Sequence, residues 1–203
     1  MREKGILENT VIIFASDHGD YLGDHGLSGK TSYYQAACHI PLLVCHPDFQ
    51  ASIVSNNLVT LTDVTATILG LAGCDIPTYM DATPLSGLGL TDEGEREHIV
   101  GMLRNGWMLF DGTWKLCKYA SGAHLFNLED DPDEQHNLAR DSRCADIFHC
   151  MDTQLTALKS CRRRTRRFSR NACTLSVILA VQTLVALAGI EPIRCPGMVP
   201  PEV

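Results

Sequence analysis

An unbroken apolar run occupies residues 11–15, Val-Ile-Ile-Phe-Ala. Its β-branched and aromatic side chains predict a strand that is buried on both faces, as strands of parallel sheets are. The run ends at Ser16, Asp17 and His18, and four glycines follow within the next eleven residues. A buried strand delivers polar side chains in this way to the carboxyl edge of an α/β sheet, where ligands commonly bind.

The next hydrophobic segments predict a strand, a short extended stretch and a helix. Residues 33–37 are expected to form one helical turn, and the apolar residues 40–45 form a second strand whose first residues include Pro41. Residues 57–59 are short and extended. Residues 63–73 carry an apolar helical face, with Thr62 in the N-cap position and Gly73 at the end.

The third part of the pattern predicts an antiparallel sheet closed by a helix. Residues 76–97 are rich in Gly, Pro, Thr and Asp and are expected to be mostly loop. Two hairpin-turn dipeptides, Asn105-Gly106 and Asp111-Gly112, separate apolar runs. The predicted strands are residues 98–103, 107–110, 114–119 and 124–128. An acidic solvated turn follows at 129–134, and a helix at 145–158.

The last forty residues differ in kind from the rest of the chain. Residues 161–170 contain six arginines, and residues 174–190 contain no charged side chain. A span of seventeen residues is at the short limit for crossing a membrane, which takes about 20. Its basic flank would lie on the cytoplasmic side. A membrane helix and a tail unrelated to the preceding fold are equally compatible with this pattern.

Composition and length indicate a globular protein of one domain, or of one domain and a small appendage. The chain has 203 residues, of which 45% are hydrophobic and 20% charged. Residues 1–159 carry 10 Lys and Arg against 22 Asp and Glu, which argues against nucleic acid as a partner. The nine cysteines are an odd number, so we expect buried thiols instead of a complete disulfide framework. The N-terminus has no apolar signal-peptide core, which predicts a cytoplasmic location by default.

Four motifs resemble the sulfatases of the alkaline phosphatase superfamily. Residues 16–30, SDHGDYLGDHGLSGK, resemble the late metal-binding segment of that family, and residues 40–44 and 62–73 are similar to the strand and helix that follow it. Residues 125–139, LFNLEDDPDEQHNLA, resemble the C-terminal signature. The resemblance covers residues 1–158. It implies an α/β fold: part of an alkaline-phosphatase-like doubly wound sheet, followed by a small antiparallel sheet with a helix.

This resemblance implies three domains or segments and three site residues. Residues 1–75 correspond to the C-terminal part of the catalytic domain, 76–158 to a C-terminal α+β subdomain, and 159–203 to a tail. Asp17 and His18 correspond to two ligands of the divalent metal, and Lys30 to the lysine that contacts the sulfate. Adjacent carboxylate and imidazole groups can share one cation, and a lysine adds a mobile positive charge for an anion.

The resemblance also implies a cofactor and a substrate class. Calcium is the default metal of the family. Because His18 is a softer ligand than the asparagine of many relatives, manganese or another transition metal is also open. The implied substrate is a small-molecule or glycan sulfate ester. We expect Asp20, Asp24 and His25 to serve loop structure or to surround the ligands, and His39 and His46 to be structural.

The chain departs from the family pattern at the nucleophile. Sulfatases carry an early Cys/Ser-x-Pro-x-Arg motif whose first residue becomes formylglycine, and this sequence has none. Cys45-His46-Pro47 begins similarly, but Phe49 stands where the arginine would be. An early acidic pair is also absent, and His39 replaces a usual arginine. The resemblance is therefore to the C-terminal portion. A catalytically inactive fragment or binding protein, and a phosphodiester or phosphonate ester hydrolase, remain alternative interpretations.

Overall fold

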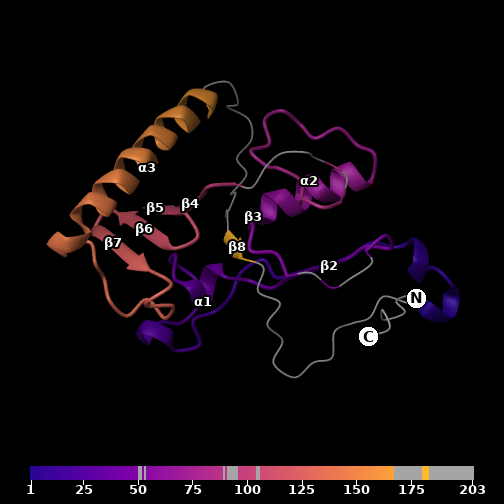
Figure 1. The fold of residues 1–203 in the computed structure, drawn as a ribbon, viewed down its shortest axis with the longest axis horizontal. Helices are drawn as coiled ribbons and strands as arrows, with labels where there is room; N and C mark the ends of the chain where they lie inside the picture. Colours follow the sequence, from indigo (N-terminus) through magenta and orange to yellow (C-terminus); the bar gives the residue numbers. More distant parts are fainter. Residues whose placement is uncertain are drawn as a thin grey trace, which may run out of the picture.

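The computed structural model describes residues 1–49, 52, 54–88, 90, 96–103, 106–166 and 180–182, with side chains described up to residue 160 (Figure 1). Its largest element is a four-stranded antiparallel sheet made of β4 (Ile99–Leu103), β5 (Gly106–Phe110), β6 (Trp114–Tyr119) and β7 (Gly122–Asn127). The strands lie in sequence order, so the predicted meander is confirmed. At the Asp111-Gly112 turn, Asp111 Oδ1 accepts the backbone N–H of Thr113 at 3.0 Å and of Trp114 at 2.7 Å.

The two faces of this sheet are covered by different elements (Figure 1). One face packs on α3 (Ala145–Arg166) through alternating strand residues and through Met151 and Leu155 of the helix. The strand residues on this face are Val100, Leu109, Leu116 and Leu125. The helix was predicted to end at residue 158 and continues to Arg166. The opposite face packs on Tyr33 and on Cys38 of α1 (Gln35–Cys38) through Ile99, Met108, Phe110 and Cys117.

The first predicted strand exists, but its expected parallel pairing and two-sided burial are wrong for the described chain. β1 (Ile12–Ala15) pairs antiparallel with β2 (Leu42–Cys45), with Ile12 opposite Cys45. Among the described residues β2 is its one partner strand, so one edge and much of one face of β1 are open. Phe14 is consequently 59% exposed.

Helix α2 (Leu61–Leu71) begins two residues earlier than predicted, with Thr60 and not Thr62 as its N-cap. Thr60 follows directly on β3 (Leu58–Thr60) and forms a capping box with Asp63. The buried Asp63 carboxylate accepts the backbone N–H of Thr60 at 2.6 Å. This hydrogen bond favours Thr60 over Thr62 as the N-cap. The helix packs through Val64 on Ile40, Leu42 and Leu85, so the loop after α2 contributes to the core.

Four short 3₁₀ turns and one further strand complete the described elements. The turns are Arg2–Lys4, Leu7–Asn9, Asp24–Gly26 and Ser142–Cys144. Strand β8 (Ala180–Gln182) pairs antiparallel with β3. The other residues of the apolar segment 174–190 lie outside the described residues, so the membrane prediction stays a prediction there. Within the described part of the chain, no helix is both long enough and apolar enough to cross a bilayer.

Candidate active site

Asp17 and His18 lie immediately beyond the end of β1, with their ring and carboxylate close together. His18 Nε2 is 3.4 Å from Asp17 Oδ2. His18 Nδ1 lies 2.6 Å from the carbonyl oxygen of Gly19. Because a carbonyl can only accept, Nδ1 is the donor in this contact, and in the neutral ring Nε2 then keeps its lone pair.

This geometry fits the donor set of one cation. Two lone-pair donors 3.4 Å apart can both bind a metal at bond lengths of roughly 2.0–2.6 Å. A metal-binding imidazole commonly donates its other N–H to a backbone carbonyl, as His18 does to Gly19. The two side chains are 82% and 28% exposed, so water and ions can reach them. Within the described residues, no group of three or more His, Cys, Asp or Glu side chains could hold a metal.

Lys30 stands at the end of the glycine-rich loop and is exposed. The loop doubles back on itself, since Tyr21 N donates to Gly29 O at 2.9 Å and Gly23 N donates to Leu27 O at 3.0 Å. The buried Tyr21 fixes the base of this loop by donating its hydroxyl to Ser32 Oγ at 2.7 Å. In the described part of the chain, no hydrogen bond or ion pair joins Lys30 to Asp17 or His18. The structure thus brings the two predicted metal ligands together and leaves the lysine on a neighbouring loop.

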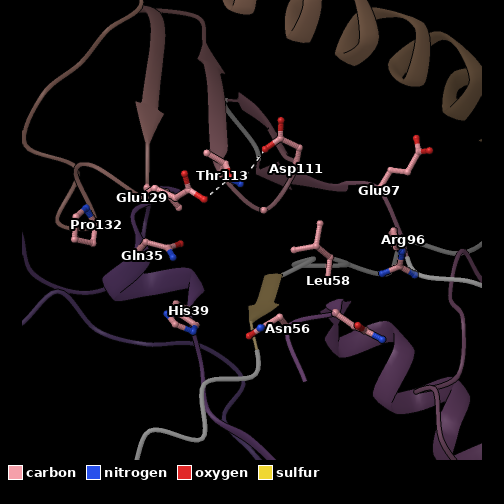
Figure 2. A pocket seen from close by; sticks show the side chains of 13 residues that line it. Gln35, His39, Asn56, Leu58, Arg96, Glu97, Asp111, Thr113, Glu129 and Pro132 are labelled. Atoms are coloured by element: carbon pink, nitrogen blue, oxygen red, sulfur yellow. Dashed lines mark hydrogen bonds between the residues drawn. The ribbon is translucent and has the colours of Figure 1, made fainter. Parts of the chain in front are cut away.

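Two cavities lie along α1 and do not include the three predicted residues. The larger, of about 650 Å³, opens between α1, the residues before β3 and the loops at one end of the sheet (Figure 2). The smaller, of about 530 Å³, lies between α1 and the 129–135 turn and also includes His25. His39 lines both cavities. The His25 ring stacks on that of Tyr34 with centroids 3.8 Å apart, which is consistent with a structural role in the loop.

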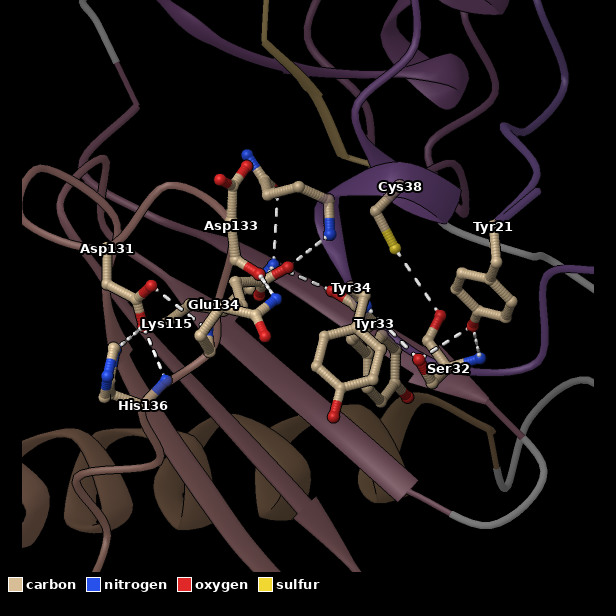
Figure 3. A network of polar contacts seen from close by, with 12 residues as sticks. Tyr21, Ser32, Tyr33, Tyr34, Cys38, Lys115, Asp131, Asp133, Glu134 and His136 are labelled. Carbon is tan, nitrogen blue, oxygen red and sulfur yellow. Dashed lines mark hydrogen bonds and ion pairs between the residues drawn. The ribbon is translucent and has the colours of Figure 1, made fainter. Parts of the chain in front are cut away.

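A buried polar network lies beside these cavities, and sequence reasoning missed it (Figure 3). Lys115 of β6 forms an ion pair with Glu134, and their side chains are 2% and 1% exposed. Glu134 belongs to the acidic run that we expected to be a solvated turn, so that prediction is wrong for this residue. The available signal was the position of Lys115, which shares the inward face of its strand with Cys117. The carboxylate is buried because it has a buried ammonium as its partner.

Burial keeps the ionisable side chains around this network neutral. It raises the pKa of the Cys38 thiol to about 11 and raises the pKa of Cys117 as well. The same cause raises the pKa of the Tyr33 and Tyr119 hydroxyls. These thiols and hydroxyls are therefore neutral near neutral pH. Of the six described cysteines, Cys38 and Cys117 are the buried ones.

Solved structures with the same arrangement define the class of fold. A phosphonate monoester hydrolase from Silicibacter pomeroyi is similar to 87% of this chain and 40% of its own length, with a TM-score of 0.69 and 22% identity. A 2-O GAG sulfatase is similar to 78% of this chain and 37% of its own length, with a TM-score of 0.67 and 23% identity. These likenesses show the fold: the chain has part of an alkaline-phosphatase-like α/β fold, as predicted.

Sequence comparison then gives the family. The family model described as Sulfatase matches residues 1–74. Arylsulfatase K from Homo sapiens is 30% identical over 177 residues, which is 78% of this chain and 32% of that protein. The chain is a member of the sulfatase family, whose enzymes generally use a divalent metal ion. It spans about a third of the length of this relative.

Proposed function

We propose that this chain supplies the metal-binding and anion-binding part of a sulfuric ester hydrolase that acts on a small-molecule or glycan sulfate ester. The observation that carries the proposal is the Asp17–His18 pair, whose two donors lie 3.4 Å apart just beyond the end of β1. The match of the Sulfatase family model to residues 1–74 supports it, because these residues include the pair and Lys30.

Each residue has a distinct role in this proposal. Asp17 and His18 bind the divalent cation, and calcium is the metal that we propose first, with manganese as the alternative. When bound, such a cation polarises the oxygens of the ester's anionic group. Lys30 adds a point charge for those oxygens from an exposed loop position. The Gly19 carbonyl fixes the orientation of the His18 ring and leaves Nε2 for the metal.

The nucleophile is not among the residues of this chain. The sequence contains no Cys/Ser-x-Pro-x-Arg motif, so the proposed activity belongs to a protein that supplies this motif outside the 203 residues. Sulfate is proposed over phosphonate because the family model and the relatives at 30% identity are sulfatases. The phosphonate monoester hydrolase shares the fold at 22% identity, which is a statement about architecture alone.

The test is a calorimetric titration of the 203-residue chain with Ca²⁺ and with Mn²⁺. We expect Asp17→Asn to weaken binding of the preferred metal by about tenfold or more, because a charged oxygen ligand is lost. Asp20→Asn is the matched control, since this exposed aspartate caps the loop through Leu22 N. Equal affinities for wild type and Asp17→Asn would contradict the proposed metal role.

The same chain should fail to hydrolyse an aryl sulfate ester, even with saturating calcium. The reason is the missing nucleophile, and the measurement is release of the phenol over hours at a protein concentration near that of the substrate. Turnover that is abolished by Lys30→Ala would show that the chain contains a working nucleophile and would overturn this part of the proposal.

A further inference from the structure

We propose that the buried Lys115–Glu134 pair is a positioning element that orients His18 for metal binding, through α1 and Gly19. This inference rests on the proposed function, because it assigns a purpose to the arrangement of Asp17 and His18. Lys115 and Glu134 lie about 100 residues after Asp17 and His18 in the sequence, and neither would contact the metal or the substrate.

In the first step, the ion pair forms hydrogen bonds with the residues at the start of α1 (Figure 3). Lys115 Nζ donates to the Tyr33 carbonyl oxygen at 2.8 Å and to Gln35 Oε1 at 3.1 Å. Glu134 Oε2 accepts the backbone N–H of Gln35 at 2.5 Å. Both charged groups therefore bind Gln35, Lys115 by donating to its side chain and Glu134 by accepting its backbone N–H, and Lys115 also binds Tyr33. This fixes the N-terminal end of α1 against the sheet.

The second step leads from the other end of α1 to Gly19. Gly19 N donates to Ala37 O at 2.9 Å. A Cβ on Gly19 would lie 1.9 Å from Ala36 O, so the loop backbone touches the helix directly. Because α1 is a single turn, Gln35–Cys38, a shift at its start is transmitted to these carbonyls with little loss.

The third step is the imidazole itself. Gly19 bonds α1 through its N–H and His18 through its carbonyl, since His18 Nδ1 donates to Gly19 O at 2.6 Å. That hydrogen bond selects the tautomer whose Nε2 can bind a metal. A continuous series of short contacts thus runs from the sheet to the metal-binding nitrogen.

Because a buried ion pair contributes little to stability, its presence here indicates a role in fixing geometry. Replacing a buried ion pair with uncharged residues of similar shape is often neutral or stabilising, whereas a network of charged hydrogen bonds specifies geometry.

Strand β6 also carries a matched comparison. Lys118 binds Asp152 of α3 at 2.6 Å on the opposite side of the sheet, where both side chains are about one-third exposed.

The experiment compares two double variants of the full chain, Lys115→Met/Glu134→Gln and the control Lys118→Met/Asp152→Asn. Two readouts need no metal: the hydrogen-exchange rate of the Gly19 amide and the ¹⁵N signals of the His18 ring, which report its tautomer. The third readout is Mn²⁺ affinity. Melting temperature is recorded to separate global stability from local order.

We expect the Lys115→Met/Glu134→Gln variant to exchange the Gly19 amide about tenfold faster and to lose the preference for the Nδ1–H tautomer of His18. Its Mn²⁺ affinity should fall by about fivefold, less than the 10–100-fold typical of groups bonded directly to a ligand. The control should leave all three readouts at their wild-type values. If the double variant does not fold, Gln35→Ala replaces it, because this change removes the contact of Lys115 with the Gln35 side chain and leaves the buried ion pair intact.

Wild-type exchange at Gly19 and wild-type His18 signals in a folded variant would overturn the positioning role. The positioning role is also overturned if the control variant changes the Gly19 exchange rate and the His18 signals as much as the Lys115→Met/Glu134→Gln variant does. If the signals change as expected but the wild-type chain binds neither Ca²⁺ nor Mn²⁺ at a site that Asp17→Asn weakens, the positioning role stands. The proposed metal function then fails, so the two failures are distinguishable.

Discussion

Gly19 is the residue at which the loop after β1 and helix α1 come closest. A Cβ there would lie 1.9 Å from the Ala36 carbonyl oxygen, which is backbone and cannot move aside cheaply. We expect Gly19→Ala to lower the free energy of unfolding by about 2 kcal/mol, the cost of overpacking a tight contact. Urea denaturation monitored by circular dichroism measures this change.

Gly70→Ala is the control for that prediction. Gly70 lies inside α2, and a Cβ there would meet the flexible tip of the Leu90 side chain at 3.2 Å. An alanine inside a helix is favoured over glycine by up to about 1 kcal/mol, so this variant should be as stable as wild type or more stable. Equal losses for the two variants would show that Gly19 has no special contact.

At the residue scale, the sequence indicated the candidate site residues Asp17 and His18, but it did not indicate the buried Lys115–Glu134 pair. Asp17 and His18 follow an apolar strand within a recognisable motif, and the structure shows their side chains with a geometry that suits a cation. Their metal-binding role stays a prediction. The Lys115–Glu134 pair was missed: the strand pattern places Lys115 on an inward face but does not name its partner, which lies 19 residues away and meets it only when β7 and the following turn fold back. A charged run on its own gives no reason to single out one buried member.

At the scale of elements, Asp63 is the side chain on which α2 depends most. Its Oδ2 accepts Thr60 N at 2.6 Å and its Oδ1 accepts Thr83 N at 2.9 Å, while Arg96 donates to both oxygens. Asp63→Ala removes a buried acceptor from all of these donors. We expect a loss of about 3 kcal/mol in the free energy of unfolding, as for other broken buried ion pairs.

The exposed Asp75, just after α2, provides the comparison. Asp75→Ala should change the free energy of unfolding by no more than about 0.5 kcal/mol in the same urea titration. A small effect of Asp63→Ala would mean that Arg96 and the two amides find water as a substitute, and that the capping box does not determine where α2 begins.

Elements with local signals were predicted well, and elements that depend on distant partners were not. Asn105-Gly106 and Asp111-Gly112 specify hairpins within a few residues, and β4 to β7 form the predicted meander. The cap of α2 was placed two residues late because two threonines compete for it, and only the buried Asp63 decides between them. The pairing of β1 was predicted wrongly because an apolar run shows that a strand exists and not which strand lies beside it.

At the scale of the whole molecule, the sheet β4–β7 has both faces covered, whereas the β1–β2 pair does not. Helix α3 covers one face of that sheet and α1 with Tyr33 covers the other. On β1, Phe14 is 59% exposed and Ile12 is 36% exposed, and an open apolar strand edge favours association between chains. We therefore expect the isolated 203-residue chain to self-associate as its concentration rises.

Phe14→Thr tests this expectation while keeping a residue that suits a strand. Burying one aromatic side chain contributes about 2 kcal/mol, so its removal should raise the apparent dissociation constant for self-association by about thirtyfold. Sedimentation velocity over a range of concentrations measures the change. Tyr79→Thr is the control, because Tyr79 is 84% exposed but lies in the loop after α2 and belongs to none of the described strands. A wild-type chain that stays monomeric at all concentrations, with a cooperative melt, would show that the open edge of β1 does not drive association.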